Sequence, residues 1–60
     1  MAQFSLTIDC DNAAFTEDYP GDEIARILRE LAEKIEGGTL QNIRLNDVNG
    51  NFVGIADLSE

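Results

Sequence analysis

Only one segment of this chain has the residue spacing of an amphipathic helix. Between residues 24 and 35, large aliphatic side chains recur at intervals of three and four positions. They are Ile24, Ile27, Leu28, Leu31 and Ile35. This spacing forms one apolar stripe, and such a stripe must pack against another apolar surface. Pro20 suits the first turn of a helix, and Gly37-Gly38 suits the left-handed conformation of the residue that ends a helix. We therefore expect one helix between them.

The first segment, residues 4–10, alternates strictly between apolar and polar side chains. The apolar set is Phe4, Leu6, Ile8 and Cys10, and the polar set is Ser5, Thr7 and Asp9. Alternation that includes β-branched residues is typical of a strand with one face in the core. We therefore expect a half-buried strand over residues 4–10.

Two further segments, 40–47 and 51–58, lie on either side of a turn signal. Asp47 and Gly50 suit the first and last positions of a type I turn, with Gly50 forming a bulge. We therefore expect a β-hairpin whose loop consists of residues 48–50.

The apolar residues of the hairpin favour this three-residue loop. It places Ile43 opposite Ile55 and Leu45 opposite Val53, with all four side chains on one face. A two-residue loop would turn Val53 and Ile55 away from the core, because a slip of one residue moves every side chain to the other face.

The expected order of elements is strand, helix, strand, strand, in a single α+β domain over residues 1–60. We expect a three-stranded, mainly antiparallel sheet with the last strand in the centre and one amphipathic helix packed on one face. A parallel pairing of the first two strands is the alternative. The expected core is Phe4, Leu6, Ile8, Ile24, Ile27, Leu28, Leu31, Ile35, Ile43, Leu45, Val53 and Ile55. The other face of the sheet is mostly polar, with Phe52 as the exception.

The residue types argue against catalysis and metal binding. The chain has no His, and its single Cys leaves no internal disulfide. Asp9 and Asp11 begin a pattern like a calcium loop, but Ala14 and Pro20 stand where that loop requires Gly and Glu. We therefore expect no enzymatic activity, no cofactor and no metal site. Weak divalent-ion binding at Asp9, Asp11 or Asp18 is the alternative.

The sequence shows no targeting or membrane segment. No apolar run approaches the ~20 residues of a membrane span, and residues 1–4 lack the features of a signal peptide. A lone thiol fits a reducing compartment. We therefore expect a cytoplasmic protein.

The charge of the chain is large and unevenly placed. Twelve acids and four bases give a formal net charge of −8. Residues 22–36 hold five acids and three bases, whereas the rest of the chain holds seven acids and one base. Six of the acids lie in residues 9–23, where there is no base. The net charge argues against direct binding to nucleic acid or to an anionic membrane and favours a basic protein partner.

Residues 9–23 are therefore the candidate partner-binding segment. Its carboxylates would meet Arg and Lys in a basic nucleic-acid-binding groove, and its two aromatic side chains would act as anchors. The candidate partner-binding residues are Asp9, Asp11, Phe15, Glu17, Asp18, Tyr19, Asp22 and Glu23. The alternative is a solvated acidic loop whose aromatics close one end of the core, with Phe15 as the lid.

Three segments of the chain, residues 9–15, 23–28 and 47–54, resemble a family of very small acidic proteins from phages, prophages and mobile elements. The most specific of them is the Asp-x-Asp-Asn-Ala-Ala-Phe stretch at residues 9–15. In size and charge the chain also resembles anti-CRISPR proteins that act on type I systems. The resemblance implies a non-enzymatic inhibitor in the bacterial host cytoplasm. Such an inhibitor would bind a subunit of a Cascade-like effector complex and block target DNA binding by DNA mimicry.

We expect this inhibitor to be a monomer. The alternative function is a structural or regulatory protein–protein interaction module with no anti-defence role. That module would be a homodimer through the open sheet face or an edge strand. In that case Phe52 and the last strand would matter, and the acidic segment would not.

Overall fold

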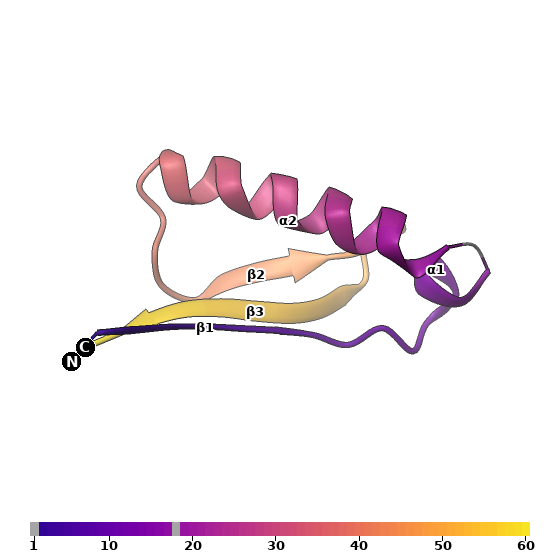
Figure 1. The fold of residues 1–60 in the computed structure, drawn as a ribbon, viewed down its shortest axis with the longest axis horizontal. Helices are drawn as coiled ribbons and strands as arrows, with labels where there is room; N and C mark the ends of the chain where they lie inside the picture. Colours follow the sequence, from indigo (N-terminus) through magenta and orange to yellow (C-terminus); the bar gives the residue numbers. More distant parts are fainter. Residues whose placement is uncertain (1, 18) are drawn as a thin grey trace.

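A computed structural model describes residues 2–17 and 19–60 of the chain. Its elements are β1 (Gln3–Ile8), α1 (Ala13–Thr16), α2 (Pro20–Glu36), β2 (Ile43–Asn46) and β3 (Phe52–Ser59). The helix α2 lies along one face of the sheet, and α1 lies at one end of the molecule (Figure 1). This order confirms the expected strand, helix, strand, strand sequence. The four-residue α1 is a helix that the sequence pattern did not predict.

The three strands form one sheet in the order β1-β3-β2, and β3 pairs antiparallel with both neighbours. The domain is therefore α+β with the last strand in the centre, as the sequence predicted. The alternative of a parallel pairing between the first two strands is wrong.

The ends of α2 follow from its sequence. Pro20 begins the helix, and Asp22 and Glu23 place acidic groups in the first turn, where the helix dipole favours negative charge. At the other end Gly38 has a φ of 105°, a left-handed conformation that suits glycine. The Thr39 N–H then donates to the carbonyl of Lys34 at 3.0 Å, which closes the last turn.

The turn between β2 and β3 has the predicted chemistry. The Gly50 N–H donates to the Asp47 carbonyl at 3.0 Å, and Gly50 has a φ of 84°. The Asp47 N–H donates to the Asn51 carbonyl at 2.9 Å, so residues 48–50 form the loop. The predicted register holds as far as Asn46, which lies opposite Phe52.

Beyond that point the predicted strand register is wrong. Leu45 lies opposite Gly54, and Ile43 lies opposite Ala56, because the register shifts between Leu45 and Asn46. The extra residue in β3 is Val53, which forms a β-bulge. Val53 remains buried although the residues after it change faces.

The bulge is followed by a close approach between β3 and β1. A Cβ atom on Gly54 would collide with the Thr7 carbonyl oxygen and would lie 3.0 Å from the Ile8 Cα. Only glycine allows the two backbones to come this close.

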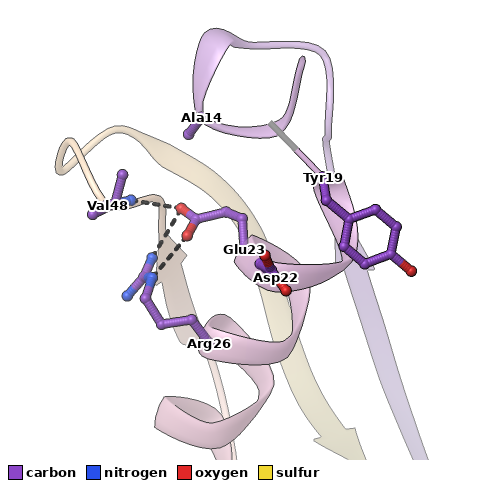
Figure 2. Close-up of a pocket in the computed structure, with 6 residues that line it drawn as sticks. All are labelled: Ala14, Tyr19, Asp22, Glu23, Arg26 and Val48. Atoms are coloured by element: carbon purple, nitrogen blue, oxygen red, sulfur yellow. Dashed lines mark hydrogen bonds and ion pairs between the residues drawn. The ribbon is translucent and has the colours of Figure 1, made fainter. Parts of the chain in front are cut away.

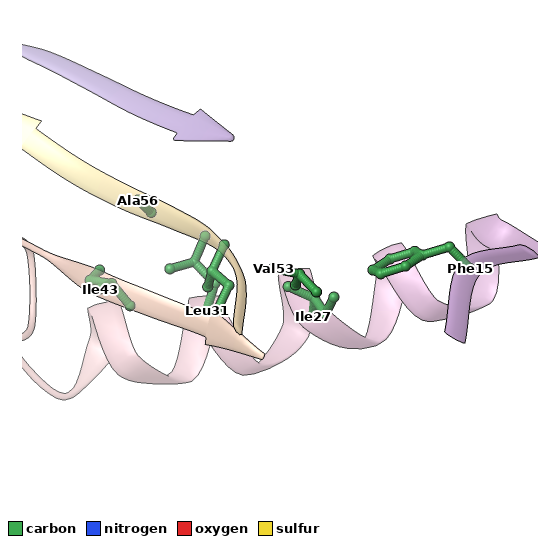
Figure 3. Packing of buried hydrophobic residues seen from close by; sticks show 7 residues of the cluster. Phe15, Ile27, Leu31, Ile43, Val53 and Ala56 are labelled. Carbon is green, nitrogen blue, oxygen red and sulfur yellow. The ribbon is translucent and has the colours of Figure 1, made fainter. Parts of the chain in front are cut away.

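The hydrophobic core lies between α2 and the β2–β3 part of the sheet, and Phe15 closes one end of it (Figure 3). Its buried members are Phe15, Ile27, Leu31, Ile43, Leu45, Val53 and Ala56. None of these side chains comes from β1.

Four residues of the expected core are exposed. They are Phe4 (42%), Leu6 (41%), Leu28 (41%) and Ile55 (41%). Ile55 is exposed because the bulge moves it to the open face. Phe4 and Leu6 are exposed because α2 packs against β2 and leaves β1 largely uncovered. Of the remaining expected core residues, Ile8, Ile24 and Ile35 are half-buried beside the core.

Candidate functional site

The α1 end of the molecule brings together three segments: residues 9–17, the first turns of α2, and the 47–51 turn. The Asp47 carboxylate ties the first of these to the third. It accepts a hydrogen bond from the Asn12 side chain at 2.8 Å and from the Asn49 and Asn51 N–H groups, each at 2.9 Å. Asn12 also caps α1 by accepting from the Ala14 N–H at 3.1 Å. One buried carboxylate therefore positions both α1 and the turn.

The charge on Asp47 is stabilised where it lies. Burial raises its pKa, but the Asn51 backbone and side chain, the Asn49 N–H and the Asn12 side chain all donate to the ionised form. Together these hydrogen bonds hold the pKa of Asp47 below its ordinary value.

Glu23 ties α2 to the same turn. Its carboxylate is 8% exposed and accepts from Arg26 Nε at 2.8 Å, from Arg26 Nη2 at 3.1 Å and from the Val48 N–H at 2.7 Å (Figure 2). Arg26 also pairs with Glu30 at 3.0 Å and donates to the Asn46 carbonyl at 3.1 Å. The Arg26 bond lowers the pKa of Glu23, burial opposes the shift, and the Val48 bond adds to it. The same bond raises the pKa of Arg26.

An open hollow of about 530 Å³ lies over this ion pair (Figure 2). It is lined by Ala14, Tyr19, Asp22, Glu23, Arg26 and Val48. Tyr19 is 71% exposed and Val48 is 66% exposed, so two large apolar side chains stand in solvent beside it. A smaller hollow of about 220 Å³ is lined by Ala13, Ala14, Glu17, Val48 and Asn49.

The Glu23 carboxylate is already held by Arg26 and Val48, so it is not free to act as a general base. Within residues 2–17 and 19–60 there is no group of three or more His, Cys, Asp or Glu side chains that could hold a metal ion.

The candidate partner-binding residues divide into two groups. Those with exposed side chains are Asp9, Asp11, Glu17, Tyr19 and Asp22. We call their four carboxylates, from Asp9, Asp11, Glu17 and Asp22, the acidic end. Asp18 lies outside the described residues.

The other two candidates are inside the molecule. Phe15 is 1% exposed and belongs to the core, which matches the alternative of a core lid. Glu23 is committed to Arg26 and to the turn. Neither side chain has a free surface in the folded chain.

Sequence reasoning missed two residues of this region. Val48 is a β-branched residue at the tip of a turn, where Asn, Asp, Ser, Gly and Pro predominate. A β-branched residue at such a position is a sequence signal for an apolar side chain that is exposed and available to a partner. Asp47 was assigned to the turn alone, and its bond to Asn12 had no local signal because the two residues lie 35 positions apart.

The fold and this region define a small α+β domain with a three-stranded antiparallel sheet, one main helix and one acidic end. No family model, curated protein or solved structure matches the chain. In the part of the chain that the structure describes, no helix combines the length and apolar character needed to cross a bilayer.

Proposed function

We propose that this protein is a phage-encoded, non-enzymatic inhibitor that binds a type I CRISPR effector complex through its acidic end and blocks target DNA binding. The observation that carries the proposal is the distribution of charge. Four carboxylates are exposed around α1 and the start of α2, and residues 9–22 contain no base. The nearest cation in sequence, Arg26, is already paired with Glu23 and Glu30.

Such a surface complements a groove that binds DNA. Duplex DNA presents about one negative charge per 1.7 Å of its axis, so its binding surfaces carry many Arg and Lys side chains. A compact protein with a net charge of −8 is attracted to the same surface and competes with DNA for it. Attraction of this kind speeds association and weakens as salt increases.

Tyr19 and Val48 supply the apolar part of the interface. Charges give steering and selectivity, whereas desolvated aromatic anchors carry much of the affinity of a protein interface. Both side chains are mostly exposed and both line the larger hollow. A partner that covers the hollow would bury them together.

The target class comes from the resemblance to small acidic phage proteins and type I anti-CRISPR proteins. The proposal accordingly places the protein in the bacterial host cytoplasm, bound to a basic subunit of a Cascade-like complex.

The test is inhibition of target DNA binding by a purified type I effector complex at two salt concentrations. The double variant Asp11→Lys/Glu17→Lys should lose inhibition, since it reverses two charges of the acidic end. The matched control is Glu33→Lys/Glu36→Lys, which makes the same change in net charge at exposed positions in the second half of α2. The control should keep most of its inhibition. Equal inhibition by the two variants would mean that the acidic end is not the contact.

A further inference from the structure

The two edges of the sheet are protected very differently. β2 has four residues, and two cations of α2 bond to its backbone: Lys34 to the Arg44 carbonyl at 3.2 Å and Arg26 to the Asn46 carbonyl at 3.1 Å. Short strands and charged side chains are the usual protection of an edge against pairing with another chain. β1 is longer, with six residues, and residues 2–8 contain no charged side chain.

The backbone alternation shows which residues face the free edge of β1. The Asp9 N–H donates to the Val53 carbonyl of β3 at 2.7 Å. In an antiparallel pair, successive residues direct their backbone groups alternately toward and away from the partner strand. Phe4, Leu6 and Ile8 therefore direct their N–H and C=O groups toward the free edge.

Two of these residues, Phe4 and Leu6, form an apolar strip that α2 leaves uncovered, and the half-buried Ile8 continues the strip toward the core. Leu6 lies opposite Ala56, a fully buried core residue, so the strip is on the helix-bearing face of the sheet. Phe4 and Leu6 are nevertheless 42% and 41% exposed, and Leu28 on α2 is also 41% exposed. An uncovered strip next to an unpaired edge provides both the hydrogen bonds and the apolar surface of an interface.

We infer that β1 pairs antiparallel with β1 of a second copy, joining two three-stranded sheets into one six-stranded sheet. This pairing is self-complementary, as a twofold interface must be. With the twofold axis at Leu6, Leu6 faces its own counterpart, and Phe4 faces Ile8. All these side chains then lie on the helix-bearing face, so the two strips join between the two copies of α2.

The absence of charged side chains in residues 2–8 lets a second copy approach at this edge. Two chains of net charge −8 repel each other wherever acids meet. In the proposed register residues 4–8 pair among themselves without a charge, and Asp9 lies across from the uncharged Gln3. The pairing also places the two acidic ends at opposite ends of the joined sheet, because the strands run antiparallel.

The inference differs from the monomer expected from the sequence. It takes the edge-strand form of the alternative dimer and differs from a dimer through the open sheet face, which would bury Phe52. It is independent of the proposed inhibitor function, because Asp11, Glu17 and Asp22 of each copy lie outside the paired strands.

Light scattering after gel filtration, from micromolar to submillimolar protein, tests the oligomeric state. We expect twice the chain mass of 6.6 kDa. Leu6→Lys should give the mass of a single chain, because it places two lysine side chains opposite each other at the twofold axis, where they repel. Ile55→Lys is the matched control, because Ile55 has the same 41% exposure but lies on the other face. A chain that keeps its single mass throughout would overturn the inference, and so would a dimer that Ile55→Lys dissociates and Leu6→Lys does not.

A cross-linking variant covers the case in which Leu6→Lys fails to fold. Opposed residues in a hydrogen-bonded antiparallel pair have Cα atoms about 5.5 Å apart, within the range that a disulfide spans. In a Cys10→Ser background, Leu6→Cys should form a covalent dimer rapidly with diamide. Thr7→Cys, which faces the other side of the sheet, should do so much more slowly. Equal rates for the two cysteines would contradict pairing at β1.

Discussion

The carboxylate of Glu23 accepts a 2.7 Å hydrogen bond from the backbone N–H of Val48, a residue 25 positions further along the chain. This bond joins the first turn of α2 to the turn between β2 and β3. It also separates two roles that the sequence could not distinguish. The Glu23 side chain is buried and stabilises the fold, whereas the Val48 side chain is exposed beside the hollow.

Replacing Glu23 with Gln should destabilise the fold. The change removes the charge-assisted bonds to Arg26 and weakens the bond to Val48, and hydrogen bonds to charged groups are worth about 1.5–3 kcal/mol. We expect the free energy of unfolding, measured by urea titration with circular dichroism, to fall by about 1–2 kcal/mol. Glu33→Gln removes the same charge from an exposed position of α2 and should change it by less than about 0.5 kcal/mol. Similar losses in both variants would show that the change in net charge, and not the bonds of Glu23 to Arg26 and Val48, is responsible.

Stability should decrease in acid. Glu23 and Asp47 both have a pKa below the ordinary value in the folded state, so the unfolded state binds more protons as the pH falls. Their contribution is complete above the unfolded pKa values of about 4 and is lost as the pH falls through the lower folded values. Relief of the repulsion from the net charge acts in the opposite direction.

The Tm measured between neutral pH and about pH 2 should therefore fall below about pH 4. The double variant Glu23→Gln/Asp47→Asn isolates the contribution of these two groups. It should be less stable at neutral pH, and its Tm should depend less on pH in the acid range. If the Tm of the two proteins falls equally as the pH is lowered, other carboxylates are responsible for the loss of stability in acid.

Gly54→Ala should be strongly destabilising. The new Cβ would collide with the Thr7 carbonyl, which belongs to backbone and has little freedom to move. Overpacking of this kind costs about 1–3 kcal/mol or more. Gly37→Ala is the control, because Gly37 has a φ of −79° and its Cβ would make only ordinary contacts of 3.5 Å or more. Thermal unfolding of the two variants measures the difference, and a Gly54→Ala protein as stable as Gly37→Ala would refute the close approach of β1 and β3.

Phe15 and Tyr19 should respond in opposite ways to truncation. Phe15→Ala removes a ring that is 1% exposed and should lower the free energy of unfolding by about 3–5 kcal/mol. That loss is a large share of the total free energy of unfolding of a small domain. Tyr19→Ala removes a ring that is 71% exposed, so the fold should keep its Tm. Under the proposed function, Tyr19→Ala should also weaken partner binding by more than about 1 kcal/mol. Circular dichroism and a binding titration separate the two effects. A Tyr19→Ala protein that folds and binds normally would remove Tyr19 as an anchor.

The hairpin shows how far a local pattern reaches. The residues from Asp47 to Gly50 predicted the turn correctly, because turn chemistry depends on a few adjacent residues. The same local pattern also predicted the pairing of β2 with β3, and that prediction is correct at Asn46 but wrong at Leu45 and Ile43. The bulge at Val53 is linked to the close approach of β1 at Gly54, and β1 is nearly fifty positions away in the sequence.

The candidate site was predictable to a similar degree. The segment with the acids was visible as a stretch without bases, and most of the side chains named from it that the structure describes are exposed. The sequence could not show that Phe15 and Glu23 are buried. Phe15 is buried by packing into the core, and Glu23 is buried where it bonds to the 47–51 turn. Val48 was missed because it lies outside the acidic segment.

The sequence by itself determined the helix from Pro20 to Glu36, the alternation of β1, the turn after β2 and the strong negative charge, because each depends on residue types within a few positions. Tertiary structure alone decided which strand α2 covers and which residues of β3 face the core. Those outcomes depend on how distant segments pack: α2 bonds to the β2 backbone through Arg26 and Lys34, and that position leaves Phe4 and Leu6 uncovered at the β1 edge.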